Sequence, residues 1–330
     1  MDDGIFLSDV SERDKPWDLH RWQSDLVQAL YDGTDFTSYA TRISKCSQFL
    51  GFNWTSDELT GDVSLRLDQA RFCRVRYCPV CQWRKSLMWR ARFYNAVPRI
   101  LEVFPSHRFI FLTLTVQNCS VNELGSVVAS MNQAWSKLTR RKVFPAVGWL
   151  KSVEVTRNQT QGSKWLDTAH PHFHALLMVD SGYFVGRRYI KQSVWRELWR
   201  DVLGVNYLPV VNVKSVKAKF GQDYSHALRS ALTETLKYTV KPGDLIGDRT
   251  LSESAPVVAN RSWLIEITRQ LSGSRSISVG GVLRDFIRDS DPEDLIHAED
   301  SPCLGETSDD ADIWFNWHQS FKRYRSSKGG

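Results

Sequence analysis

Apolar residues in the middle of the chain alternate between strand-like and helix-like spacing. Residues 107–116 are apolar and rich in β-branched side chains, which predicts a buried strand, and helical spacing follows over 121–138. Two more strands are predicted at 148–156 and 171–179, with the polar loop 157–169 between them. Further along, the pattern predicts a helix at 191–203, a short strand at 208–213, and a helix at 223–240 that ends at Pro242 and Gly243.

The two ends of the chain have a different character. Residues 1–35 predict a loosely ordered leader followed by a short helix at 18–31. Between 284 and 312, eleven acidic residues stand against two basic ones, which predicts a mobile acidic segment. The stretch 313–324 is aromatic and then basic, and we expect it either to dock onto the body of the protein or to contact DNA.

Composition and charge narrow the class of protein. The chain has 330 residues, of which 42% are hydrophobic and 24% charged, so it can bury a sizeable core. Its net charge of +6 favours an anionic partner, and residues 66–108 alone carry ten basic against two acidic side chains. We expect no signal peptide and no membrane span, because no apolar run of sufficient length occurs. Cysteine usage favours a reducing cytoplasm rather than a secreted disulfide scaffold.

A cluster of histidines opens one of the predicted strands. Residues two apart on a strand face the same way, so His172 and His174 project together while Phe173 faces the opposite, packed side. Two imidazoles whose Cα atoms lie about 7 Å apart can converge on one divalent cation. Glu154 on the expected hairpin partner is a third candidate ligand, and this donor set suits Mg²⁺ or Mn²⁺. A single histidine is more often a core residue, and Glu154 alone could equally be a solvated strand residue.

The predicted helix at 223–240 and the residue just beyond it carry an acid, a phenol and an ammonium group at helical spacing. Glu234, Tyr238 and Lys241 are four and three residues apart, so we expect them to share one face. A tyrosine can attack phosphorus if its proton is removed and cations neutralise the developing charge. The alternative is an ordinary amphipathic helix with a surface Glu–Lys pair and a half-buried tyrosine.

The cysteines in the first third of the chain predict a structural zinc site. Cys73, Cys78 and Cys81 are spaced as a tight knuckle, and the fourth ligand is either Cys46 or His107. Buried cysteines without metal are the alternative.

A basic and aromatic segment follows the knuckle at 82–93 and predicts a helix. We expect Trp83 and Phe93 to pack inward, with basic side chains reaching DNA. The DNA-contact candidates in this region are Arg74, Arg76, Arg84, Lys85, Arg90 and Arg92.

Three motifs, in order, resemble those of the HUH endonucleases, most closely the replication initiators of small rolling-circle plasmids. They are FLTLTV at 111–116, HPHFHALL at 170–177 and KYTVK at 237–241. The resemblance covers roughly residues 40–290, including the cysteine block, and it favours Cys46 as the fourth zinc ligand. Only one tyrosine occurs in the third motif, which is typical of the single-tyrosine type.

The resemblance implies an α+β fold with a central antiparallel sheet, helices packed mainly on one face, and a cysteine-rich zinc-binding element. It implies four segments: an N-terminal leader at 1–40, a zinc-binding and DNA-contact region at 41–98, a nuclease domain at 99–287, and an acidic segment with an aromatic and basic tail at 288–330.

The resemblance also implies a chemistry. A cation held by His172, His174 and Glu154 would polarise a phosphate of origin DNA exposed as a single strand. Tyr238 would attack it, leaving a 5′-phosphotyrosine link and a free 3′-OH primer, and Glu234 would act in termination. His170 would support the ligands rather than bind metal.

The implied partners are origin DNA, a host polymerase and a host helicase, since the chain has no phosphate-binding loop for nucleotides. Two rivals are a relaxase or transposase of the same superfamily and a zinc-containing DNA-binding regulator without catalysis. The regulator leaves the histidine pair and the tyrosine face without a role.

Overall fold

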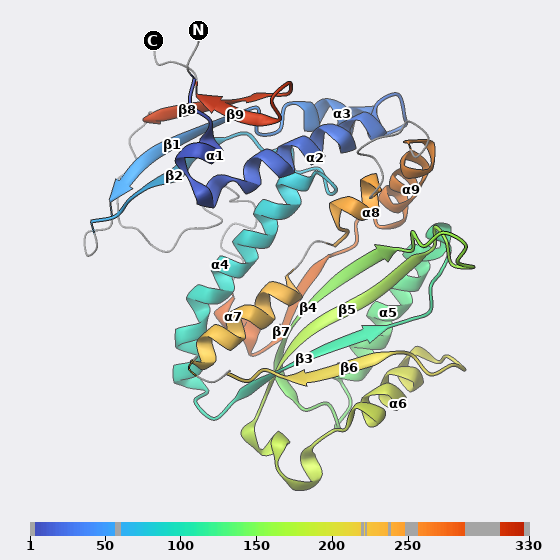
Figure 1. Cartoon of the computed structure of the whole chain (residues 1–330). Coiled ribbons are helices and arrows are strands. Elements are labelled where there is room, and N and C mark those ends of the chain that lie inside the picture. The colour runs from blue at the N-terminus through green and yellow to red at the C-terminus, as the bar shows by residue number, and fades with distance from the viewer. Residues whose placement is uncertain are drawn as a thin grey trace. The chain divides into compact units, whose positions relative to one another are not determined.

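The computed structural model describes residues 4–56, 61–218, 221, 223–236, 239–247, 257–287 and 311–326 (Figure 1). The chain divides into two compact units. The first, which we call the cysteine unit, comprises Met1–Met88, Leu245–Ile265 and Asp291–Gly330. The second, the histidine unit, comprises Trp89–Asp244 and Glu266–Ser290. The long helix α4 (Pro79–Val103) and the helix α9 (Val257–Gln270) each contribute residues to both units.

The histidine unit is built on a five-stranded antiparallel sheet with strand order β6-β3-β5-β4-β7. Its centre is the long hairpin of β4 (Ala146–Arg157) and β5 (Ala169–Val179), with β3 (Arg108–Thr115) on the other side of β5. The edge strands are β6 (Val211–Ser215) and β7 (Ile277–Gly281). The strands expected at 107–116, 148–156 and 171–179 are confirmed. The strand expected at 208–213 begins later, after Pro209, which has no N–H to donate to a neighbour.

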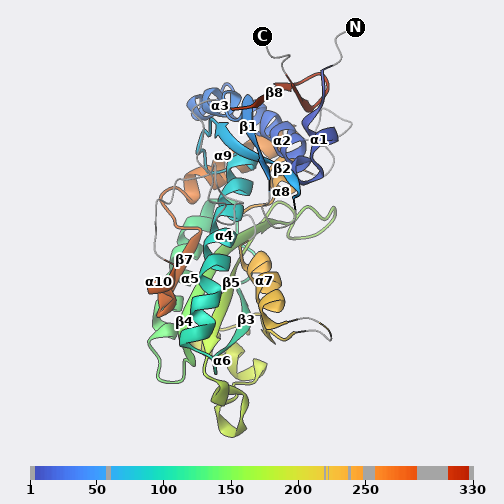
Figure 2. The same ribbon diagram turned by 90° about the vertical axis from the view of Figure 1, so that its left-hand side faces the viewer.

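Helices cover both faces of this sheet, and not mainly one face as expected. Side-chain alternation explains why, because apolar residues occupy both sides of β4 and β5. Leu150 and Leu176 pack in a core with α4 and with α7 (Tyr224–Thr235). Phe173, on the opposite face, contacts Trp135 of α5 (Leu124–Thr139) and Trp199 of α6 (Gln192–Leu203). The helices α7 and α5 lie on opposite sides of the sheet (Figure 2). The α+β class and the antiparallel sheet are confirmed.

The helix expected at 223–240 is shorter in the structure. Its first residue is Tyr224 and its last is Thr235, and the side chain of the preceding Asp223 accepts a hydrogen bond from the His226 N–H. From Thr235 onward, hydrogen bonds to β4 replace those of the helix. The Ser152 hydroxyl donates to the Thr235 carbonyl, and the Val155 N–H donates to the Thr239 carbonyl. The chain after α7 therefore bonds to β4 beyond the end of β7. Continuation into Pro242 is also unfavourable to a helix.

The cysteine unit contains a four-stranded sheet with order β2-β1-β8-β9. The hairpin of β1 (Phe49–Ser56) and β2 (Val63–Ala70) pairs with the hairpin of β8 (Ile313–His318) and β9 (Arg323–Ser326). The stretch 313–324 thus docks into a sheet, one of its two expected fates, and Phe315 and Tyr324 are fully buried. The acidic segment at 288–310 lies outside the described residues.

The expected N-terminal leader is folded. It forms α1 (Leu7–Val10), the 16-residue helix α2 (Pro16–Tyr31) and α3 (Thr37–Ser44). The indole of Trp17 is fully buried and meets Trp83 edge to face. These residues belong to the same unit as the cysteine block, so the structure has no unit boundary at residue 40. The short helices α8 (Pro242–Ile246) and α10 (Leu283–Phe286) are the remaining α-helices of the described residues. No helix among the described residues combines the length and apolarity that a membrane span requires.

Candidate functional site

Glu154, His172 and His174 converge on one face of the histidine unit's sheet. Glu154 is the cross-strand partner of His172, and His174 lies two residues further along β5. The Glu154 Oε2 atom lies 3.1 Å from Nε2 of His172 and 2.7 Å from Nε2 of His174. Phe173 points to the opposite face and is fully buried, as the alternation predicted. The three candidate ligands therefore come together as the sequence analysis expected.

The ring nitrogens that face away from Glu154 have partners of their own. His172 Nδ1 lies 3.2 Å from the His170 carbonyl, and His174 Nδ1 lies 3.2 Å from the Thr113 hydroxyl on β3. Such bonds fix which nitrogen keeps its lone pair for a metal ion. Thr113 was not among the site residues expected from the sequence. The signal was a threonine at an inward position of the apolar strand, directly opposite His174 in the register.

The electrostatic setting keeps Glu154 ionised. Burial raises the pKa of its carboxyl, but hydrogen bonds and charge from His172 and His174 outweigh burial and hold the pKa well below its usual range. Lys241 Nζ lies 3.4 Å from Glu154 Oε1. Lys241 is about half exposed, so the ammonium group beside Glu154 is accessible to solvent.

The donor set and spacing suit a small divalent cation. In octahedral coordination at about 2.1 Å, neighbouring ligand atoms lie about 3.0 Å apart, close to both the 3.1 Å and 2.7 Å separations at Glu154. All three ligand atoms lie within 4.8 Å of one another. Three protein ligands leave coordination positions for substrate oxygens.

Of the expected tyrosine face, only part lies within the described residues. Lys237 and Tyr238 are outside them. Glu234 lies in the last turn of α7 and is half-buried. The expectation that Lys241 shares a helical face with Glu234 is wrong, because α7 ends at Thr235. Lys241 reaches Glu154 from the segment that follows the helix instead.

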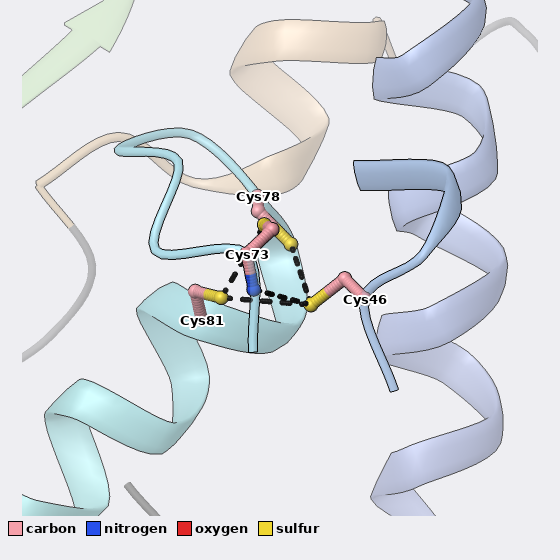
Figure 3. A group of neighbouring side chains, drawn as sticks. All are labelled: Cys46, Cys73, Cys78 and Cys81. Carbon is pink, nitrogen blue, oxygen red and sulfur yellow. Dashed lines mark hydrogen bonds between the residues drawn. The ribbon is translucent and has the colours of Figure 1, made fainter. Parts of the chain in front are cut away.

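Four thiols in the cysteine unit form a second candidate metal site (Figure 3). The Sγ atom of Cys81 lies 3.6 Å from those of Cys46 and Cys73, and the Sγ atoms of Cys46 and Cys78 are 3.8 Å apart. A tetrahedral Zn²⁺ with bonds of about 2.3 Å requires sulfur atoms about 3.8 Å apart. Burial raises the pKa of the Cys78 thiol, but hydrogen bonds with the other three thiols outweigh burial and lower it well below its ordinary value. These residues could hold zinc.

The structure selects Cys46 over His107 as the fourth member of this cluster. Buried contacts fix the chain on both sides of Cys46. The Arg21 guanidinium donates to the Ile43 carbonyl, and the Tyr324 hydroxyl donates to the Ser47 carbonyl at 2.6 Å. The thiol of Cys46 is therefore positioned by a helix from the N-terminal region and a strand from the C-terminal region.

The basic residues around α4 divide into exposed and buried members. Trp83 and Phe93 are buried, as expected. Arg84 is also buried, at 1% exposure, and its guanidinium lies over the rings of Trp17 and Trp83. The expectation that Arg84 contacts DNA is therefore corrected: its position on α4 points it into the helical core. The other candidates keep some solvent exposure: Arg74, Arg76, Lys85, Arg90 and Arg92.

Comparison with known proteins identifies the family. The family model described as "Replication protein" matches residues 64–325, which is most of the chain. The chain belongs to this family of plasmid replication initiators. It is 34% identical over 249 residues to a "Protein rep" of Streptococcus pneumoniae serotype 2 (strain D39 / NCTC 7466), covering 74% of this chain and 70% of that protein. It is 32% identical over 305 residues to a "Protein rep" of Bacillus amyloliquefaciens, covering 86% and 84%.

A third Rep relative, from Lactiplantibacillus plantarum, is 34% identical over 259 residues, covering 75% of this chain and 77% of that protein. The matched region of the family model includes both candidate metal sites except Cys46. No solved structure matches the chain. Membership of the Rep family makes origin DNA the expected partner.

Proposed function

We propose that this Rep protein is a metal-dependent, site-specific endonuclease and strand transferase of the HUH type. It nicks a plasmid origin through attack by Tyr238 and so starts rolling-circle replication. The observation that carries the proposal is the cluster of Glu154, His172 and His174 with the Lys241 ammonium beside it. A relaxase or transposase would use similar ligands, but the Rep relatives favour the replication initiator.

The segments on both sides of Tyr238 support its role as the nucleophile. Thr235, three residues before it, accepts a hydrogen bond from Ser152 of β4. Thr239, which directly follows it, accepts one from Val155 of β4 at 2.8 Å. Ser152 and Val155 bracket Glu154 in the sequence. Thr235 and Thr239, on either side of the proposed nucleophile in the sequence, are therefore both bonded to the part of β4 that carries Glu154.

The proposed reaction transfers a phosphodiester from a deoxyribose oxygen to the tyrosine. The Tyr238 oxygen loses its proton and forms a bond to phosphorus, the bond from phosphorus to the 3′ oxygen breaks, and that oxygen takes up a proton. The products are a 5′-phosphotyrosine link and a 3′-OH primer. The bound divalent cation, Mg²⁺ or Mn²⁺, supplies charge neutralisation at the phosphate. Lys241 offers a further positive charge on the same side.

Glu234 is the proposed acid–base residue of the closing step. It lies one turn before Tyr238 in the sequence and sits at the end of α7, next to the anchored segment. In this role it removes a proton from water, or assists a second strand transfer, so that the covalent link is released. A host helicase and a host polymerase would unwind and extend the nicked strand.

The test uses a supercoiled plasmid that carries the cognate origin, with Mn²⁺ or Mg²⁺ present. We expect nicking with covalent attachment of the protein to DNA, and loss of both in Tyr238→Phe while origin binding persists. Tyr189→Phe is the matched control, because Tyr189 is an exposed tyrosine that follows the opposite end of β5. A Tyr238→Phe protein that still forms the adduct would remove this tyrosine from the mechanism.

A second variant, Glu234→Ala, distinguishes the first nick from the later release of the covalent link. We expect Glu234→Ala to keep the first nick and to accumulate the covalent adduct, because release depends on proton removal by this carboxylate. Equal loss of nicking and release would give Glu234 a structural role instead.

A further inference from the structure

The loop that joins β4 to β5 carries a large aromatic side chain into solvent. Trp165 is 38% exposed, and its neighbour Leu166 is 37% exposed. The loop comprises residues 158–168 and extends from the end of the sheet that carries the metal ligands, because Glu154 lies only three residues before the end of β4 (Figure 1). Three strand residues span about 10 Å. The loop that bears the exposed indole therefore begins about 10 Å from Glu154.

Backbone hydrogen bonds hold this loop in one conformation. Asn158 N donates to the Thr168 carbonyl at 3.0 Å, and Asp167 N donates to the Asn158 carbonyl at 2.8 Å. The Trp165 carbonyl accepts bonds from both the N–H and the hydroxyl of Thr168. Trp165 N donates to the Ser163 hydroxyl. The indole is thus presented from an ordered turn, so a ligand need not order the backbone to bind it.

The charges around the indole favour an anionic ligand. Lys164 Nζ lies 5.0 Å from the centre of the Trp165 ring and is exposed. The nearby carboxylate, Asp167, is paired with the buried guanidinium of Arg157 at 2.7 Å. Lys164 therefore presents a positive charge next to the aromatic face of Trp165.

The loop also borders the segment that bears Lys241. The side-chain amide of Gln159 lies 3.3 Å from the Gly243 carbonyl, to which it donates, and 3.4 Å from the Asp244 carboxylate. Gly243 and Asp244 follow Lys241 by two and three residues. The loop therefore contacts the segment that bears Lys241, whose ammonium group lies 3.4 Å from Glu154.

We propose that Trp165 and Lys164 bind one nucleotide of single-stranded DNA next to the metal centre, with the base stacked on the indole and a phosphate on the ammonium group. This deepens the proposed function, on which it rests, by assigning residues that hold the substrate strand. Every base has a face that can stack on an aromatic ring, and a neighbouring cation matches the backbone. Two adjacent exposed apolar side chains are too few for a stable protein interface, which favours a nucleotide as the occupant.

Binding of fluorescent single strands to the full-length protein tests the proposal in the absence of divalent metal. One probe is a 20-nucleotide oligothymidylate, and the other is an abasic phosphodiester chain of the same length. We expect Trp165→Ala to weaken oligothymidylate binding roughly 5- to 150-fold, the range that stacking of one base contributes. Binding of the abasic chain should stay within twofold, and Trp165→Phe should restore much of the loss.

Two further variants complete the design. Lys164→Gln should weaken binding of both probes and reduce the slope of log affinity against log salt by about 0.7, the value for one phosphate contact on a single strand. Tyr189→Ala, which removes an exposed aromatic residue beyond the opposite end of β5, should leave both affinities unchanged.

Wild-type affinity for oligothymidylate in Trp165→Ala would overturn the proposal, and so would equal loss for the two probes. Because these measurements need no metal and no cleavage, they are separate from the test of Tyr238. A protein that stacks DNA on Trp165 but never forms an adduct would contradict the nickase proposal alone.

Discussion

Glu154 and His172 face each other across β4 and β5, with the carboxylate oxygen 3.1 Å from the imidazole nitrogen. This register brings together one candidate metal ligand from each arm of a single hairpin, and His174 adds the third candidate from two residues further on. A hairpin whose register slips by one residue would turn one arm's ligands to the other face. The long pairing of β4 with β5, supported by β3, therefore fixes the ligand geometry.

Replacing Thr113 with valine should weaken metal binding without removing a ligand. The Thr113 hydroxyl lies 3.2 Å from His174 Nδ1 and orients the ring. Loss of such a partner typically costs 10- to 100-fold in metal affinity. Calorimetric titration with Mn²⁺ measures the change in metal affinity. Thr115→Val is the control, since the Thr115 hydroxyl donates to the Val210 carbonyl instead; equal loss in both variants would contradict the orienting role.

Removal of the Lys241 charge should slow adduct formation more than it weakens DNA binding. Lys241 lies 3.4 Å from Glu154, and in the proposed reaction its positive charge would neutralise charge that develops during attack on the phosphate. Deleting one such preorganised group usually lowers the rate by about 10²-fold or more. Single-turnover nicking by Lys241→Ala measures this, and Lys241→Arg should recover part of the rate. A rate for Lys241→Ala within threefold of wild type would assign the lysine to binding or stability.

If the cysteine cluster holds zinc as proposed, loss of one thiol should abolish zinc binding and destabilise the cysteine unit. Cys46 is fully buried, and its Sγ atom lies 3.6 Å from that of Cys81. We expect Cys46→Ser to lose one zinc equivalent by elemental analysis and to unfold at a lower temperature. Cys119→Ser is the control, because Cys119 belongs to the histidine unit and lies outside this cluster. Full zinc content in Cys46→Ser would exclude Cys46 as a ligand.

The buried amine of Lys151 should make stability depend on pH. Burial lowers the pKa of Lys151 to about 7 from 10.5, while its Nζ lies 3.8 Å from the Phe173 ring and donates to Asn132. Between pH 7 and 10.5 the unfolded chain binds more protons at this residue, so its contribution to folding becomes more favourable as pH rises.

Replacing Lys151 with methionine removes this dependence. The free energy of unfolding of Lys151→Met, relative to wild type, should be most favourable at and below pH 7 and fall by about 2 kcal/mol between pH 7 and pH 9. Urea denaturation at several pH values measures the difference. Lys137→Met on the exposed side of α5 should give a difference that does not change with pH. A constant difference for Lys151→Met as well would show that the amine is not titrating in this range.

Local sequence signals were sufficient to predict most strands and helices of the histidine unit. The period-two alternation around His172 and His174 predicted both the strand and the shared face, and the cysteine spacing predicted three members of the thiol cluster. These signals are short-range, so a single sequence contains them. The helix before Tyr238 was predicted too long, because its end depends on hydrogen bonds from Ser152 and Val155, which lie about 80 residues earlier in the chain.

Long-range pairing was not accessible from the pattern. The docking of β8 onto β1 joins residues more than 250 positions apart, and nothing in residues 313–324 alone selects that partner. Burial of Arg84 was missed for a related reason. Its position on a basic helix favoured exposure, but Trp17 and Trp83 provide an aromatic site for the guanidinium. The contacts of Arg84 with these two tryptophans, and not its residue type, therefore determine its burial.

The strand β9 has a consequence for how this protein is made. The ribosome synthesises β1 early, yet the sheet that contains it gains its last strand only when residues 323–326 emerge. The strands of the histidine unit are all translated by residue 281. The strands that carry the proposed catalytic ligands can thus assemble first. The chain beside Cys46 gains its hydrogen bond from Tyr324 only after the C-terminal strand has been synthesised. A truncated product of interrupted translation would lack the Tyr324 contact that holds the chain beside Cys46, a candidate zinc ligand.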